Sequence, residues 1–212
     1  MHIPDGFISP QTYLPAYAVS GLLWAVGVRR LRARLDVETL PRLAVTSAAA
    51  FVLMLVLIPL PGGTTAHATG IGMLAVLFGV WTTFLCLSLV FLLQAVMLGE
   101  GGVTSLPINA LAMGLVGASV AIGVHRLLRS FSERIALFAA GFLGLNVAAL
   151  CMALVLGIQP QIATAPDGSP RFFPFGLEVT IPAVMLPHLL VGVGEGLLTV
   201  LVVGLMRRRE SV

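Results

Sequence analysis

Long apolar runs separated by short polar segments make up most of this chain. A transmembrane helix needs about 20 mostly apolar residues, and seven stretches approach that length. The predicted spans are residues 12–28, 43–60, 68–81, 82–98, 106–125, 135–157 and 180–206. The third and fourth divide one run that is too long for a single crossing, and we place the break at Gly79 to Thr82. The third span is short, so we expect a partial or tilted element.

The basic residues predict an orientation for these spans. All 12 are arginines, and 11 of them fall on one side of the membrane if the chain crosses seven times. These 11 are Arg29, Arg30, Arg32, Arg34, Arg42, Arg126, Arg129, Arg134, Arg207, Arg208 and Arg209, with Arg171 on the other side. Positively charged loops favour the cytoplasm, so the pattern predicts an outside N-terminus and a cytoplasmic C-terminus.

Composition agrees with an all-α polytopic membrane protein that forms a single integral membrane domain over residues 1–212. Hydrophobic residues make up 58% of the chain and charged residues 10%, whereas soluble domains carry about 25% charged residues. The net charge of +3 does not indicate nucleic-acid binding, because the arginines flank the spans. Membrane lipid is the expected surrounding.

Four segments face outward in this topology: residues 1–11, 61–70, 99–105 and 158–179. The last contains four prolines at 160, 166, 170 and 174, which excludes a regular helix. It is interpreted either as a lid over the outer face or as a structureless connector.

Two of the four histidines, His2 and His67, lie in these outer segments. A free Met1 amine, the His2 amide nitrogen and the His2 Nδ1 can form two fused chelate rings, and a His67 imidazole could complete a square of nitrogens. Square-planar nitrogen ligation favours Ni(II) or Cu(II) over Zn(II). The alternative is that His2 is a loose terminal side chain and that His67 caps a turn.

Four stretches of the sequence resemble one known family, in the same order along the chain. They are MHIPDGFISP, PGGTTAHATG, GEGGVTSLPINALAMG and HLLVGVGEGLLT, which together extend from residue 1 to about residue 205. They resemble the CbiM/NikM family, the substrate-binding membrane component of cobalt and nickel energy-coupling-factor (ECF) transporters. The resemblance implies seven spans and an N-terminal segment tucked into the outer-facing centre, where Met1, His2 and His67 bind Ni²⁺ or Co²⁺. Ala112 stands where the family has a second Asn, and Glu100 where relatives often have Asp or His.

The resemblance also implies a function and partners. The chain would capture Ni²⁺ or Co²⁺, its transported substrate, with high affinity at the outer face of a prokaryotic cytoplasmic membrane, without an organic cofactor. A transmembrane coupling subunit of the EcfT/CbiQ type, a pair of cytoplasmic CbiO-type ATPases and a small CbiN-type membrane protein would complete an ATP-driven importer. The chain has no GxxxxGK[ST] phosphate loop, so we expect a non-catalytic subunit.

Other polar residues near the outer face have open roles. Asn109 is expected either to hydrogen-bond the N-terminal segment or a ligating imidazole, or only to cap its helix. Thr65 and Glu100 are candidates for the rim, where Glu100 either balances the charge of a divalent ion or is solvated. Asp5 is expected to close the Pro-Asp-Gly turn.

Two ionisable residues, His188 and Glu195, share one face of the last span. An intramembrane carboxylate is costly and indicates a function, and we expect Glu195 to be internal and structural or to couple to a partner. Two rival functions remain. An autonomous divalent-metal permease would need a continuous polar path, and an intramembrane hydrolase would rest on Ser119 and His188 alone.

Overall fold

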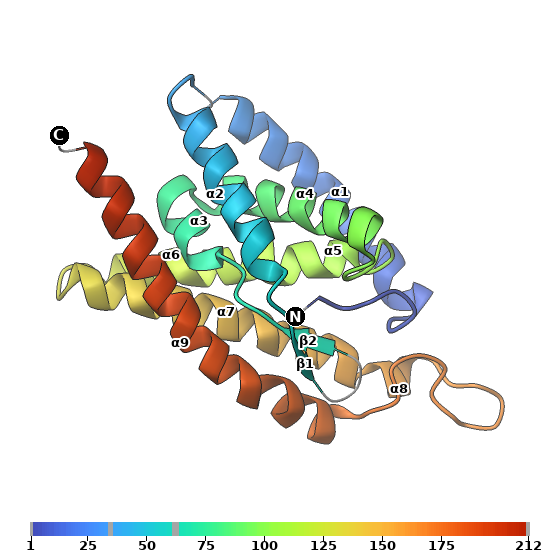
Figure 1. Ribbon diagram of the computed structural model, residues 1–212. Coiled ribbons are helices and arrows are strands. Elements are labelled where there is room, and N and C mark those ends of the chain that lie inside the picture. The colour runs from blue at the N-terminus through green and yellow to red at the C-terminus, as the bar shows by residue number, and fades with distance from the viewer. Residues whose placement is uncertain (1, 34–35, 61–63, 211–212) are drawn as a thin grey trace.

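The computed structural model describes residues 2–33, 36–60 and 64–210, which are mostly helical (Figure 1). The helices are α1 Pro10–Arg32, α2 Thr39–Met54, α3 Ile71–Phe78, α4 Val80–Leu98, α5 Leu106–Asn109, the π-helix η1 Ala110–Gly117, α6 Ala118–Leu128, α7 Glu133–Gly157, α8 Gln159–Ile162 and α9 Leu177–Glu210. Two short strands, β1 Ile58–Leu60 and β2 Thr64–Ala66, lie between α2 and α3.

Several helices are long and apolar enough to cross a membrane. Within the described residues there are four, namely Val80–Leu98, Leu106–Leu128, Glu133–Ile162 and Leu177–Arg208. The apolar helix α2 is shorter, and α1 is 23 residues long but ends in three arginines. The fold is therefore that of a helical, multi-pass membrane protein.

The predicted break in the long apolar run lies at Gly79. Helix α3 ends at Phe78 and α4 begins at Val80, and Gly79 between them has a φ of 84°. A positive φ suits a residue without a Cβ, so the chain can turn sharply here. Helix α3 has eight residues, and the expectation of a short third element is confirmed.

The second predicted span, 43–60, is wrong at its end. Helix α2 stops at Met54, and β1 then pairs with β2 in an antiparallel hairpin in which Ile58 lies opposite Ala66. Pro59 cannot continue a helix because it has no N–H to donate. The hairpin brings the chain back towards α3, and His67 follows directly after β2.

Small residues bring the central helices into close contact. A Cβ added at Gly144 of α7 would lie 3.0 Å from the Gly117 carbonyl oxygen of η1, and one added at Gly141 would lie 2.7 Å from the Glu195 carbonyl oxygen of α9. Glycine therefore permits backbone approach between α7 and both neighbours, as small residues do between membrane helices. These contacts serve internal packing.

The segment between α7 and α9 packs against the N-terminal segment. Gln159 Oε1 accepts a hydrogen bond from the Ser9 N–H at 2.9 Å, and the Phe173 N–H donates to the Phe7 carbonyl at 3.2 Å. The Phe7 and Phe173 rings lie 5.6 Å apart, and Phe173 is buried. These contacts favour the lid interpretation of residues 158–179 over a structureless connector.

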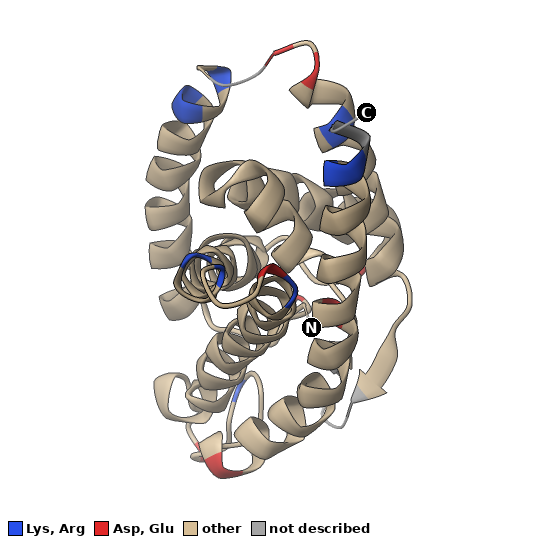
Figure 2. Cartoon of the chain, turned by 90° about the vertical axis from the view of Figure 1, so that its left-hand side faces the viewer, with Lys and Arg blue, Asp and Glu red and all other residues tan. Residues whose placement is uncertain are grey.

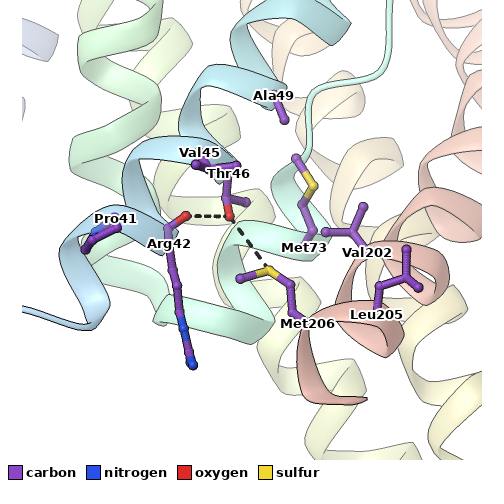
Figure 3. Close-up of a pocket in the computed structure, with 9 residues that line it drawn as sticks. All are labelled: Pro41, Arg42, Val45, Thr46, Ala49, Met73, Val202, Leu205 and Met206. Carbon is purple, nitrogen blue, oxygen red and sulfur yellow. Dashed lines mark hydrogen bonds between the residues drawn. The ribbon is translucent and has the colours of Figure 1, made fainter. Parts of the chain in front are cut away.

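Arginines and a largely apolar cavity lie towards the end of the molecule away from the N-terminal segment. Figure 2 shows arginines at the end of α1, at the α6–α7 turn and at the end of α9. Near this end lies a cavity of about 500 Å³ between α2, α3 and α9 (Figure 3). Its lining is Pro41, Arg42, Val45, Thr46, Ala49, Met73, Val202, Leu205 and Met206. The predicted metal-binding histidines are not part of it.

Candidate metal site

The N-terminal segment is clamped inside the helices through the backbone of Ile3. The Ile3 N–H donates to Asn109 Oδ1 at 3.0 Å, and Asn109 Nδ2 donates back to the Ile3 carbonyl at 3.3 Å. Ser105 Oγ also donates to that carbonyl. Ile3, Ser105 and Asn109 are all buried. Because both polar groups of one residue are held, the position of its neighbour His2 is fixed.

Asp5 holds the same segment to the 99–105 loop. Its carboxylate accepts hydrogen bonds from the Val103 N–H at 3.1 Å and the Thr104 N–H at 2.8 Å, and from the Thr104 hydroxyl. The sequence prediction that Asp5 closes its own turn missed this role. A Cβ at Gly102 would lie 2.3 Å from Asp5 Oδ1, so glycine at that position allows the contact.

His2 and His67 face each other in the interior. Their ring centroids lie 4.7 Å apart, and the exposed fractions of His2 and His67 are only 2% and 1%. The Phe91 and His2 rings pack edge to face, with their centroids 4.7 Å apart. Within the described residues, neither His2 nitrogen nor His67 Nε2 has a hydrogen-bond partner. Three buried ring nitrogens are thus left without partners in a small space.

The other nitrogen of His67 has a partner that determines its chemistry. His67 Nδ1 lies 3.1 Å from the Ala68 carbonyl oxygen, which can only accept a hydrogen bond. The proton is therefore assigned to Nδ1, and the lone pair to Nε2. A backbone hydrogen bond of this kind commonly orients a metal-binding imidazole.

Glu100 places a carboxylate beside the histidines. Its Oε1 lies 3.9 Å from His2 Nδ1, too far for a hydrogen bond, and accepts one from Thr65 Oγ1 at 3.0 Å. One potential ligand atom from each of His2, His67 and Glu100 lies within 4.8 Å of the others. The predicted rim residues Thr65 and Glu100 are thus in contact, and Glu100 adds a negative charge to the cluster.

Burial determines the protonation of this cluster. It lowers the pKa of His2 to about 4, although the neighbouring Glu100 opposes the shift. Burial likewise places the pKa of His67 well below its usual value. The adjacent His2 and the hydrogen bond from Thr65 hold the pKa of Glu100 below its usual range despite its partial burial. At neutral pH the cluster therefore offers two neutral imidazoles and one carboxylate.

Such a cluster is suited to a divalent transition metal. Buried polar nitrogens without partners cost about 1–3 kcal/mol each, and imidazole is a good ligand for Ni, Cu, Zn and Fe ions. Met1, the first predicted ligand, lies outside the described residues. Ala112, which departs from the family pattern, is buried in η1 three residues after Asn109.

The intramembrane pair on α9 does not join this cluster. His188 is buried, with its Nδ1 2.7 Å from the Val184 carbonyl oxygen. Glu195 is also buried, and its carboxylate accepts backbone hydrogen bonds from the segment that follows His67. Sequence reasoning missed this link, although a carboxylate within an apolar helix must have polar partners.

Comparison with known proteins decides the family. The model of the CbiM family, described as the cobalt uptake substrate-specific transmembrane region, matches residues 2–212. The chain belongs to the CbiM family. Among curated relatives of this CbiM-family chain are a probable fused nickel transport protein LarMN of Lactiplantibacillus plantarum and a fused nickel transport protein NikMN of Rhodobacter capsulatus, each 39% identical over 98% of the chain.

The CbiM-family chain spans 65% and 62% of the lengths of these two fused relatives. It is also 32% identical to a putative metal transport protein of Methanocaldococcus jannaschii, over 98% of the chain and 92% of that relative. A crystal structure of a truncated transition metal transporter matches with a TM-score of 0.94 at 37% identity, covering 99% of both chains. The arrangement of helices described above is therefore one that a solved metal transporter shares.

Proposed function

We propose that this CbiM-family chain captures Ni²⁺ or Co²⁺ as the substrate-specific subunit of an ATP-driven ECF importer. The observation that carries the proposal is the pair of facing, buried imidazoles of His2 and His67, whose free nitrogens are neutral at pH 7. The names of the family and of the relatives, which refer to cobalt and nickel, support these two ions. The chain itself catalyses no reaction in this proposal.

The proposed ligands are the Met1 amine, the His2 amide nitrogen and Nδ1, and His67 Nε2. The tautomer of His67 supports its part, because the hydrogen bond to Ala68 leaves Nε2 with the lone pair. The carboxylate of Glu100, 3.9 Å from His2 Nδ1, balances part of the charge of the ion. Asn109 holds the chelating segment in place through Ile3.

The proposed assembly rests on the family resemblance, and the positions of the arginines support its orientation. Seven membrane crossings, with the N-terminus outside and the arginine-rich ends in the cytoplasm of a prokaryotic cell, would expose the site to the exterior. Release into the cell would then need energy from a CbiO-type ATPase pair acting through an EcfT/CbiQ-type coupling subunit. The fused relatives, whose names join M and N, support a CbiN-type accessory protein as a further partner.

An N-terminal extension tests the ligand set. Protein with a native Met1 should bind Ni²⁺ at one ion per chain, and an added glycine before Met1 should remove high-affinity binding because the amine moves out of the chelate. The same glycine added after Val212 is the matched control and should change nothing. Equal affinity of the N-terminally extended and native proteins in calorimetry would contradict the proposal.

Uptake measurements test the assembly. Vesicles that contain the chain with its coupling subunit and ATPases should accumulate Ni²⁺ or Co²⁺ only with ATP. Accumulation by the chain alone, down the metal gradient and without ATP, would instead support an autonomous permease.

A further inference from the structure

A carboxylate on α9 holds the segment that carries His67. Glu195 Oε2 accepts hydrogen bonds from the Thr69 N–H at 2.8 Å and the Gly70 N–H at 3.1 Å, and Oε1 accepts one from the Gly72 N–H at 3.3 Å. Glu195 is fully buried. The three donors lie two to five residues after His67, so a single side chain fixes the backbone on one side of the imidazole.

The start of α3 provides an anion site for this carboxylate. Helix α3 begins at Ile71, with Gly70 as its N-cap at a φ of 74°. The first N–H groups of a helix have no partner within the helix, and its N-terminus carries a partial positive charge. Glu195 therefore compensates the open end of α3, and the backbone N–H groups compensate the buried charge.

Close packing fixes the segment to α9 as well. A Cβ at Gly72 would lie 2.3 Å from Thr199 Oγ1 of α9 and 2.6 Å from the Gly141 Cα of α7. The beginning of α3 thus touches α9 one turn after Glu195. Hydrogen bonds and packing together make residues 69–72 part of the same rigid unit as this stretch of α9.

We propose that Glu195 is a positioning residue for metal capture: it holds the 67–72 segment on α9 and so sets where His67 meets the metal. The inference rests on the proposed function, since it assumes that His67 is a ligand. It adds a mechanical link, because a displacement of α9 would carry the segment with it and withdraw His67 from the other ligands. Helix α9 continues to Glu210 at the arginine-rich end, so the link extends from the metal site to the opposite end of the molecule.

A double-mutant cycle tests the inference in the full-length protein with a native N-terminus. Glu195→Gln places an NH₂ group where a carboxylate oxygen accepted N–H groups, and we expect it to weaken Ni²⁺ binding about 10- to 100-fold. In a His67→Ala background the same substitution should change affinity less than about threefold, because the residue through which Glu195 acts is gone. Equal losses in both backgrounds would overturn the inference.

Two further variants keep the test decisive. Glu195→Asp retains the charge on a shorter side chain, and it replaces Glu195→Gln in the cycle if the latter does not fold. Thr180→Val is the matched control, since Thr180 is also buried on α9 and its Oγ1 donates to the Gly176 carbonyl at 2.8 Å, outside the 67–72 segment. Thr180→Val should keep the affinity of the native protein, and a loss equal to that of Glu195→Gln would overturn the inference.

The cycle separates this inference from the proposed function. If His67→Ala binds Ni²⁺ as tightly as the native protein, the ligand assignment fails and the inference fails with it. If His67→Ala weakens binding while Glu195→Gln has the same effect with and without His67, the ligand assignment stands and only the positioning role is excluded.

Discussion

The His2–His67 pair and the Glu195 carboxylate both involve the short segment 67–72, and they differ in their hydrogen bonds. Both are buried. Glu195 accepts three backbone N–H groups, whereas three of the four ring nitrogens of the histidine pair have no partner among the described residues.

This difference separates a supporting group from a binding group. A buried polar atom normally has a hydrogen-bond partner, and one that lacks a partner loses free energy. The satisfied carboxylate therefore stabilises the fold around it. The unsatisfied imidazoles keep free lone pairs at neutral pH, which a cation can use. The same comparison places Asn109 and Asp5, both fully engaged with backbone groups, with the supporting residues.

Removal of His2 should cause the largest loss of metal affinity. His2→Ala deletes one imidazole and, by loosening the chelating segment, weakens ligation through the amide. We expect a loss of at least about 1000-fold in Ni²⁺ affinity, which corresponds to about 4 kcal/mol. Competition with a metal indicator at fixed pH measures it. A loss below about tenfold would place His2 outside the ligand set.

Removal of a supporting residue should lower metal affinity less than removal of a ligand does. Asn109→Ala frees the Ile3 N–H and removes one of the two side-chain hydrogen bonds to the Ile3 carbonyl, and we expect metal affinity to fall about 10- to 100-fold, as is typical for groups that orient ligands. Asn146→Ala is the control, because the Asn146 amide nitrogen donates to the Phe142 carbonyl within α7. If both variants lose the same affinity, the clamp on Ile3 has no specific part in binding.

Two glycines in the 99–105 loop form a matched pair. Gly101 and Gly99 both have positive φ angles, 77° and 66°. A Cβ at Gly101 would lie 3.0 Å from His2 Cβ, whereas one at Gly99 would meet nothing within 4 Å. Both substitutions to Ala carry the cost of the left-handed backbone, about 1–2 kcal/mol. Only Gly101→Ala should also displace His2, with an additional loss of about tenfold in Ni²⁺ affinity by competition titration. Equal affinities would show that His2 tolerates the contact.

The pH dependence of stability concerns the metal-free protein and does not involve metal affinity. The pKa of His2 is about 4 in the folded metal-free protein, against an ordinary value of about 6.5. Its contribution to stability is therefore complete above about pH 6.5 and is lost as the pH falls towards 4, by up to roughly 3 kcal/mol. His2→Phe cannot titrate, so its Tm in detergent should fall less steeply between pH 7 and 4.5. Parallel curves would contradict the shifted pKa.

Much of the helical framework could be predicted from apolar length alone. The break at Gly79 was visible because a run from 71 to 98 exceeds one crossing, and the irregularity of 158–179 followed from its prolines. The β-hairpin at 58–66 was not visible, since Ile58 to Leu60 continues the apolar pattern of α2 and only pairing with Thr64 to Ala66 distinguishes it as a strand.

The histidines of the candidate site and the hydrogen bonds of Asn109 to the N-terminal segment could be predicted, but the contacts of Asp5 and Glu195 could not. His2 and His67 stand out because few polar residues interrupt the apolar sequence, and the family resemblance joins them. The partners of Asp5 and Glu195 lie 98 or more residues away and are backbone N–H groups, which every residue except proline possesses. The residue types therefore do not indicate which backbone groups will be partners, and only the structure identifies them.

X-ray absorption at the nickel edge of the Ni²⁺-loaded protein with an unmodified N-terminus tests the central claim most directly. The account predicts a square-planar site of nitrogen ligands that includes two imidazoles, and loss of one imidazole signal in His67→Ala. A six-coordinate site rich in oxygen, unchanged by His67→Ala, would contradict it.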